Sequence, residues 1–316
     1  VASALSLGAG LGAVAVAALD AVPEWQPTSR LAAVAACGIP YLPLPSAVAC
    51  AGMVVAGRSQ ATRMIGAAGL GAALVAGYLT WRGNGGTVGP PQGDDDFTVL
   101  SANVLYGRAD VRQLAALARG ADIVAVQENT PSFEAELNRL IEEDFPHRAG
   151  TSSMGADGTM IWSRTPLDLV GFGDTDFASV VVATTVRGVR WTVADVHPVP
   201  PQRGSRRWEG DAGTVLNLLR PHVTENLVVV GDFNAIEEHL TMRRLAQAGL
   251  RNAMAGWQAP GAGGWQPSWP TDKPFVPPLI RIDHALHSDS VAAWRPRYVV
   301  VSGSDHKAVV ATFRPR

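Results

Sequence analysis

The charged residues of this 316-residue chain lie almost entirely in its second part. Residues 1–92 contain only four arginines, one aspartate and one glutamate. By subtraction from totals of 26 basic and 28 acidic residues, 22 lysines and arginines and 26 acids remain for residues 93–316. A long stretch without charge folds readily in a membrane and poorly in water. We therefore expect an apolar anchor followed by a water-facing domain.

Three uncharged apolar stretches, 1–19, 31–57 and 64–81, predict three membrane helices, because a span requires ~20 residues. The second contains Pro40, Pro43 and Pro45, which predict a kinked or shortened helix. Two spans remain an alternative. The first stretch could instead be a signal peptide, but it lacks a basic start and two further apolar stretches follow.

The connection between the second and third stretches carries Arg58 and Arg63, whereas the loop from Asp20 to Arg30 carries more acid than base. The positive-inside rule therefore places residues 58–63 in the cytoplasm. We expect a multi-pass protein of the cell membrane with its C-terminal domain outside the cytoplasm. Residues 82–96, rich in Gly, Pro and Asp, predict a linker.

Residues 97–316 alternate between short apolar runs and amphipathic segments and predict one domain of stacked sheets covered by helices. Two of the predicted strands, SVVVATTV and VRWTVADVH, are expected to form a hairpin across Arg187 and Gly188. The predicted helices cover residues 110–119, 132–143, 205–219 and 240–248.

Polar residues end several of the predicted strands, where rigid backbone positions side chains for chemistry. GDFN is typical of such a place, because Gly231 lets the chain bend before Asp232 and Asn234; alone, it could equally be a polar turn. Stacked sheets could bring all of these side chains to one rim. They are Asn103, Glu128, His197, Asp232, Asn234, Asp283, Asp305 and His306.

In order and spacing, six short segments resemble the endonuclease/exonuclease/phosphatase superfamily, which includes DNase I, abasic-site endonucleases, inositol-polyphosphate 5-phosphatases and neutral sphingomyelinases. They are LSANV, VQE, the histidine of DVHP, GDFNA, RIDHAL and SDHKAV. The resemblance covers about residues 97–313 and implies a DNase I-like four-layer α/β sandwich of two mixed β-sheets flanked by helices. With its three apolar stretches and the segment GWQPSWPTDKPFVPPLIRIDH, the chain further resembles a membrane-anchored actinobacterial subgroup typified by VanJ.

The resemblance implies a metal site. Glu128 would be the main carboxylate on a divalent metal, Asn103 would lie near the metal and the scissile phosphate, and Asp305 would assist metal binding or orient water. Mg²⁺ fits, with Mn²⁺ as an alternative, because one or two carboxylates, waters and phosphate oxygens satisfy it.

The resemblance also implies catalytic roles. Asp232 would orient or deprotonate the attacking water, and Asn234 would hold that water or a non-bridging oxygen. His197 and His306 would donate hydrogen bonds to phosphoryl oxygens, and Asp283 would fix the imidazole of His306.

Two arginines are candidate substrate ligands. Arg164 stands in IWSRTPL, where the family often has Ser-Arg, and it could touch phosphate or merely end a strand. Arg203 follows His197 in an arginine-rich segment. A tryptophan-rich loop with Trp257, Trp265 and Trp269 could rest against lipid headgroups or pack in the core. The remaining histidines predict packing for His284 and surface positions for His147, His222, His239 and His287.

The expected function is hydrolysis of a phosphoric ester by a membrane-anchored enzyme acting outside the cytoplasm on a lipid-linked or soluble phosphate or pyrophosphate ester. A tethered nuclease acting on nucleic acid is the alternative, which the excess of acidic residues disfavours. A non-catalytic binding or sensor domain is a third possibility. The oligomeric state stays open.

Overall fold

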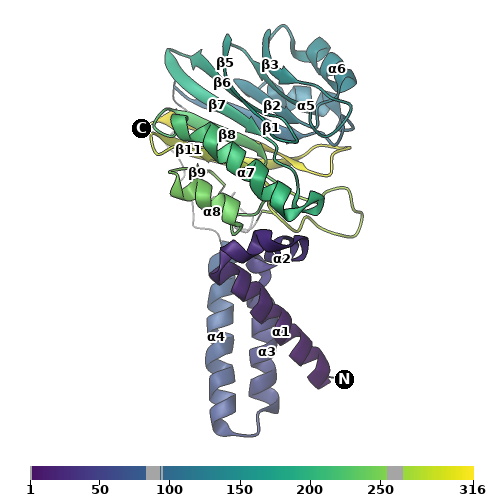
Figure 1. Cartoon of the computed structure of the whole chain (residues 1–316), viewed down its shortest axis with the longest axis vertical. Coiled ribbons are helices and arrows are strands. Elements are labelled where there is room, and N and C mark those ends of the chain that lie inside the picture. Colours follow the sequence, from purple (N-terminus) through teal and green to yellow (C-terminus); the bar gives the residue numbers. More distant parts are fainter. Residues whose placement is uncertain (1, 83–92, 94, 255–265) are drawn as a thin grey trace.

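The computed structural model describes residues 2–82, 93, 95–254 and 266–316, and two six-stranded sheets form the centre of its C-terminal part (Figure 1). In spatial order, the first sheet contains β11 (Val291–Val300), β12 (Lys307–Pro315), β1 (Phe97–Asn103), β2 (Ile123–Gln127), β4 (Thr159–Ser163) and β3 (His147–Thr151). The second contains β5 (Leu167–Gly173), β6 (Ser179–Val186), β7 (Val189–Val196), β8 (Leu227–Asp232), β10 (Asp283–His287) and β9 (Arg251–Asn252).

Both sheets are mixed, as the family resemblance implies. In the first sheet β1 pairs in parallel with β2 and antiparallel with β12. In the second, β8 pairs in parallel with β7 and antiparallel with β10. The parallel pairs point their carboxyl ends to one edge, and the antiparallel partners begin at that same edge. Six strands therefore deliver residues to one rim.

The two sheets pack face to face over an apolar core, and helices cover their outer faces. Phe97, Trp191 and Val230 are fully or almost fully buried between the sheets. Helices α5 (Val111–Ala118) and α6 (Pro131–Ile141) cover the first sheet, and α7 (Ser205–Leu219) and α8 (Leu240–Gln247) cover the second. Strands buried on both faces are apolar at successive positions, which explains runs such as VVV in β8.

Local signals in the sequence explain where these elements begin and turn. Arg187 and Gly188 have φ angles of 51° and 81°, the positive values that a two-residue hairpin between β6 and β7 requires, so the predicted hairpin is confirmed. Asp110 accepts hydrogen bonds from Arg112 N and Gln113 N and caps α5. The four helices expected in this domain are present within two residues at each end.

The N-terminal region is helical throughout its described residues. It contains α1 (Ala2–Ala21), a 3₁₀ turn η1 (Pro23–Thr28), α2 (Arg30–Ala36), a second 3₁₀ turn η2 (Ile39–Tyr41), α3 (Pro43–Ala56) and α4 (Gln60–Arg82). The expected helix over 31–57 is thus divided into α2 and α3. Pro40 and Pro43 lie at the start of η2 and α3, where a residue without an N–H is tolerated.

Helices α3 and α4 pair side by side and extend away from the sandwich, whereas α2 lies against it (Figure 1). Among the described residues, one helical segment, Ile39–Ala56, has the length and apolar composition needed to cross a membrane. The expectation of three spans stays a prediction. Most of the expected linker, residues 83–92 and 94, and the tryptophans Trp257 and Trp265 lie outside the described residues.

Two of the histidine predictions are wrong. His239 and His287 were expected at the surface, but their exposed fractions are 1% and 6%. His239 is covered by the N-terminal region, since its Nε2 donates to Ala33 O of α2 at 3.0 Å. His284 is fully buried, as expected, and donates to Ala235 O at 2.8 Å.

Candidate active site

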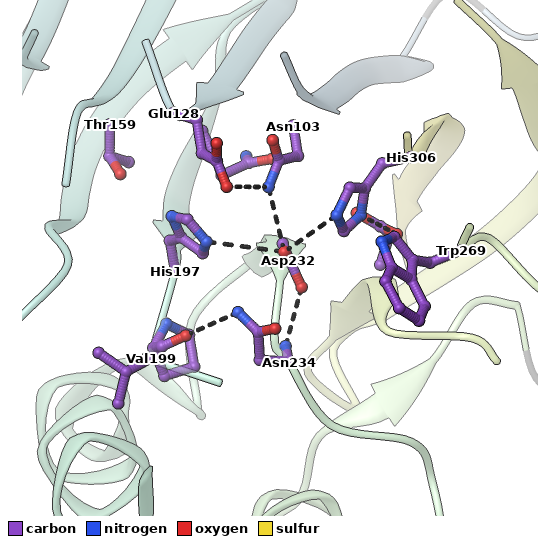
Figure 2. Close-up of polar contacts among 12 residues, drawn as sticks. Asn103, Glu128, Thr159, His197, Val199, Asp232, Asn234, Trp269 and His306 are labelled. Carbon is purple, nitrogen blue, oxygen red and sulfur yellow. Dashed lines mark hydrogen bonds and ion pairs between the residues drawn. The ribbon is translucent and has the colours of Figure 1, made fainter. Parts of the chain in front are cut away.

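The polar residues expected at strand ends meet at one rim of the sandwich (Figure 2). Asn103 ends β1, Glu128 follows β2, His197 follows β7 and Asp232 ends β8. Asp283 begins β10 and lies directly opposite Asp232 in the strand register. His306 immediately precedes β12.

Asp232 lies at the centre of the cluster. Its Oδ2 accepts a hydrogen bond from Asn103 Nδ2 at 3.1 Å and lies 3.6 Å from His197 Nε2 and 3.7 Å from His306 Nε2. Its Oδ1 accepts from the backbone N–H of Asn234 at 2.9 Å. Burial alone would raise the pKa of Asp232, but His306 and then His197 outweigh it and lower the pKa to about 2. Asp232 is therefore an anion at neutral pH.

His306 is held by a second buried carboxylate. Its Nδ1 donates to both oxygens of Asp283, at 3.1 and 3.0 Å. Burial would lower the pKa of His306, but Asp283 and Asp232 together raise it to about 10. The ring is an imidazolium at neutral pH, and its Nε2–H points toward Asp232 (Figure 2).

Asp283 and His306 are themselves supported by residues that the sequence did not single out. Ser268 Oγ accepts from the backbone N–H of Asp283 at 3.2 Å, and Tyr298 donates its hydroxyl to Asp283 O at 2.7 Å. Ser304 accepts from His306 N and donates to Asn103 O at 2.7 Å. Ser304 lies within the SGSDH segment, so its position two residues before His306 could have predicted this supporting role.

Glu128 and Asn103 form the other side of the cluster. Asn103 Nδ2 donates to Glu128 Oε1 at 3.2 Å, and Tyr106 N donates to Glu128 Oε2 at 2.9 Å. Burial raises the pKa of Glu128. A carboxylate that is costly to ionise in isolation is stabilised by a cation, and the nearby Asp232 adds a second negative charge.

The donor set fits a hard divalent cation better on the Glu128 side than around His306. Asp232, Asp283 and His306 do place ligand atoms within 4.8 Å of one another. However, both oxygens of Asp283 accept from His306 Nδ1, so these ligand atoms are already occupied by each other. Carboxylate oxygens and the amide oxygen of Asn103 suit Mg²⁺ or Mn²⁺. Asp305 Oδ1 is also buried and has no hydrogen-bond partner among the described residues.

Strained backbone surrounds the site. Leu105, Tyr106, Glu128 and Asn234 have φ angles between 47° and 57°, which side chains other than Asn and Asp rarely adopt. Such strain costs on the order of 1–3 kcal/mol per residue and gathers at functional sites. Gly231 has φ 139° and passes so close to β7 that an added Cβ would meet Val196 O at 2.0 Å. Glycine is therefore required where β8 delivers Asp232.

The two candidate substrate arginines differ in position. Arg164 follows β4 at the opposite end of the first sheet, donates to Ala121 O and pairs with Asp144. The structure does not bring it to the cluster, because β4 runs antiparallel to β2 and ends where β2 begins. Arg203 is exposed and lies over the ring of Phe177. The ring centroids of Phe177 and His197 are 4.7 Å apart, so Arg203 lies near the cluster.

A buried polar pair beneath the site was missed. Gln127 Nε2 donates to Asp195 Oδ1 at 2.5 Å and to Ser101 Oγ at 3.1 Å, joining the two sheets. Burial raises the pKa of Asp195 well above its ordinary value. Glu128 directly follows Gln127, and His197 lies two residues after Asp195. A polar residue inside each of the apolar strands VAVQ and ADV was the available signal.

The tryptophan-rich loop contributes one described tryptophan to the site. Trp269 donates its indole N–H to Asp305 Oδ2 at 2.9 Å, so this carboxylate is held beside His306, whose Nε2 lies 3.8 Å from Asp305 Oδ1. The ionised Asp232, the protonated His306 and the carboxylate and amide oxygens of Glu128 and Asn103 within one rim can orient water and stabilise charge on a phosphoryl group.

Comparisons with known proteins agree with this geometry. Solved structures with a similar fold include an endonuclease/exonuclease/phosphatase from Beutenbergia cavernae (20% identity, 70% of this chain and 72% of that chain, TM-score 0.55). A 3'-5' exonuclease (NExo) from Neisseria meningitidis is 21% identical, over 68% of this chain and 98% of that chain, with a TM-score of 0.55. A humanized D. rerio TDP2 is 17% identical, over 70% of this chain and 99% of that chain, with a TM-score of 0.54. At these identities the likeness shows a shared fold. No curated protein matches the chain.

A family model described as "Endonuclease/Exonuclease/phosphatase family" matches residues 100–306, which is more than half of the chain and spans every residue of the cluster from Asn103 to His306. The chain therefore belongs to the endonuclease/exonuclease/phosphatase family and is a hydrolase of phosphoric ester bonds.

Proposed function

We propose that this protein is a membrane-anchored, metal-dependent phosphoric ester hydrolase that acts outside the cytoplasm on a lipid-linked or soluble phosphate or pyrophosphate ester. The observation that carries the proposal is the cluster around Asp232. An ionised carboxylate lies between two histidines, one of them an imidazolium, and beside the oxygen ligands of Glu128 and Asn103.

Glu128, with Asn103, would hold Mg²⁺ or Mn²⁺, which when bound would neutralise charge on the phosphoryl oxygens and stabilise the leaving group. Glu128 is fixed for this role by the hydrogen bonds from Asn103 and from Tyr106 N. Its backbone, at φ 57°, turns the carboxylate toward the rim. Asp305, held beside His306, would assist metal binding or orient water.

Asp232 orients the attacking water. With its pKa lowered to about 2, it accepts a hydrogen bond strongly but is a weak base, so orientation is the role that this charge state favours. Asn234 donates one side-chain N–H to Pro198 O at 3.0 Å, which leaves Oδ1 and the second N–H to hold the water or a non-bridging phosphoryl oxygen.

His306 donates its Nε2–H to a phosphoryl oxygen and stabilises negative charge that develops there. Asp283 holds the ring by Nδ1 and keeps it protonated. His197 donates from Nε2 on the other side of Asp232. Arg203, exposed near His197, is the candidate for an additional contact to an anionic substrate.

The membrane part of the proposal rests on the apolar N-terminal region. The segment Ile39–Ala56 meets the requirements of a span, and α3 and α4 expose large apolar side chains including Val48, Val55, Met64 and Leu74. The bias of Arg58 and Arg63 supports a cytoplasmic loop between α3 and α4. Membership of the VanJ-like subgroup is part of the same proposal.

Nucleic acid is the alternative substrate, because one of the similar folds is a 3'-5' exonuclease. The excess of acidic over basic residues after residue 92 disfavours binding to a long polyanion.

The test is a substrate panel with the purified full-length protein, with Mg²⁺ and with EDTA. The panel contains 4-nitrophenyl phosphodiesters and monoesters, a polyprenyl pyrophosphate, and single-stranded DNA. We expect Mg²⁺-dependent hydrolysis of at least one non-nucleic ester and none of DNA. Hydrolysis of DNA alone supports the nuclease, and no hydrolysis of any substrate contradicts the proposal.

A further inference from the structure

A cavity of about 220 Å³ opens directly beside the catalytic cluster. Asn234 and His306 lie at one side of it, so a phosphate bound by these residues would place its ester group in the cavity. The other walls are largely apolar. Pro200, Trp269, Ile280 and Ile282 line it from the catalytic domain, and Cys37 lines it from the N-terminal region.

The wall that contains Cys37 is fixed to the catalytic domain by buried hydrogen bonds. Gln26, which is fully buried, donates to Glu238 O at 3.1 Å and accepts from Leu240 N at 2.7 Å. His239 donates to Ala33 O at 3.0 Å, and Cys37 Sγ lies 4.0 Å from the same ring nitrogen. The segment 238–240 follows the GDFNA motif by only a few residues. The N-terminal region is thus a wall of the site as well as an anchor.

The same wall leads to the proposed membrane span. Cys37 stands two residues before Ile39, where the apolar segment Ile39–Ala56 begins. Tyr41 donates its hydroxyl to Leu279 O, which ties the start of that segment to the loop before Ile280. This loop exposes Phe275, Val276 and Leu279, with 95% of Phe275 accessible to solvent. Exposed apolar side chains therefore lie in the loop that joins the cavity residue Ile280 to the start of the segment Ile39–Ala56. Helices α3 and α4 project away from the sandwich beyond this point (Figure 1).

This arrangement suits a substrate whose phosphate is esterified to hydrocarbon. A sugar or nucleoside ester would lose hydrogen bonds with water in a cavity whose walls, apart from Gln202 and the catalytic residues, offer few polar side chains. A hydrocarbon chain loses none and gains from burial. Because the chain must also reach the bilayer, a wall that begins a membrane span is the surface it would follow.

We infer that the cavity holds the hydrocarbon portion of an amphiphilic phosphate or pyrophosphate ester taken from the bilayer, with the N-terminal region as one wall. The inference rests on the proposed function and narrows its substrate class to lipid-linked esters. It assigns a substrate-binding role to Cys37, Ile280 and Ile282, none of which takes part in the chemistry.

The test compares esters that share a scissile bond and differ only in chain length. Hexadecyl and methyl esters of 4-nitrophenyl phosphate, and hexadecyl and methyl pyrophosphates, are assayed with Mg²⁺ and the full-length protein in detergent micelles. For the pair that is hydrolysed, we expect kcat/KM to be about tenfold or more higher for the hexadecyl ester. Equal values overturn the inference while leaving the hydrolase intact, whereas no hydrolysis of any ester contradicts the proposed function itself.

Variants that fill the cavity test whether the preference for the hexadecyl ester arises there. Cys37→Phe is expected to lower kcat/KM for the hexadecyl ester by about tenfold and to leave the methyl ester within about twofold. Val34→Phe introduces the same side chain at an exposed position of α2 outside the cavity and is the control, expected to change neither value. Unchanged kcat/KM for both esters in Cys37→Phe overturns the inference.

If Cys37→Phe loses activity toward both esters, the exposed cavity residue Gln202 decides the question, because Gln202→Trp fills the space from the catalytic domain without altering α2. Selective loss of the hexadecyl ester in Gln202→Trp supports the inference. Loss of both esters, or of neither, overturns it.

Discussion

At the scale of single residues, the site depends on charges that hold one another. Asp232 is kept ionised by His306 and His197, and His306 is kept protonated by Asp283 and Asp232. All four side chains are almost fully buried, so the charges of Asp232 and His306 depend on the partners beside them. Removing one member should therefore affect catalysis more strongly than a comparable change at the surface.

We expect Asp232→Asn and His306→Ala each to lower kcat by about 10² or more, because one removes the acceptor that orients water and the other removes a donor to the transition state. Asp168→Asn, the same chemical change at an exposed position of β5, is the control and should have little effect. Rates are measured on protein whose fold is checked by circular dichroism. Losses below about tenfold in both variants would place the chemistry elsewhere.

The residues that form the cluster were the part of the site that the sequence predicted best. Strands such as VVVG and VAVQ end at polar residues, and the sheets bring the expected cluster together. Arg164 was a candidate from the Ser-Arg of the family resemblance, with a strand end as the alternative, and the antiparallel register of β4 places it at the far end of the sheet. The surface prediction for His239 failed because its cover, Ala33, is 206 residues away in sequence.

At the scale of elements, the long apolar strands and the capped helices were predictable, and the short edge strands were not. β3 reads HRAGT and β9 has only two residues, so neither shows the apolar alternation that signals a strand. These strands exist because neighbours in the sheet supply their hydrogen bonds. The contact of α2 with the segment 238–240 likewise depends on tertiary packing that no local pattern encodes.

The contact of α2 with the segment 238–240 buries His239, and this burial predicts that the folded protein loses stability in acid. Burial lowers the pKa of His239 from its ordinary 6.5 to about 4, so the native state binds a proton more weakly than the unfolded state. The contribution of neutral His239 to the free energy of unfolding is complete above pH 6.5 and is lost as the pH falls toward 4. Between pH 7 and pH 5 the free energy of unfolding should drop by about 2 kcal/mol from this residue.

Urea denaturation of the full-length protein in detergent, followed by tryptophan fluorescence, measures this effect. His239→Gln keeps a donor for Ala33 O but does not titrate, so its stability should change less between pH 7 and pH 5 than that of the unaltered protein. The same pH dependence in both proteins would exclude His239 as the cause.

At the scale of the whole molecule, the N-terminal helices pack on the sandwich, and Cys37 of this region lines the cavity beside the active site. The sandwich follows from the order of strands and helices in the sequence. The fit of α2 against it does not, because it depends on buried contacts such as Gln26 with Leu240 N. Which side of the membrane the sandwich faces determines the substrates that it can meet.

We expect the catalytic domain to face outward, because Arg58 and Arg63 favour a cytoplasmic loop. Protease added to intact cells or spheroplasts should then cut within residues 83–96 and give a fragment that contains the catalytic domain, detected with an antibody to it. Arg58→Glu combined with Arg63→Glu should weaken this preference. Protection of the domain until the membrane is broken would reverse the orientation and favour an intracellular phosphodiesterase.

The central claim is a metal-dependent hydrolase whose metal is held by Glu128, and the dependence of hydrolysis on Mg²⁺ tests it most directly. Activity should disappear in excess EDTA and return with added Mg²⁺. Glu128→Gln should require at least about tenfold more Mg²⁺ for half-maximal activity while unfolding at a similar urea concentration. Glu143→Gln, at an exposed position, should respond to Mg²⁺ like the unaltered protein. Full activity in excess EDTA, or an unchanged Mg²⁺ requirement in folded Glu128→Gln, would contradict the account.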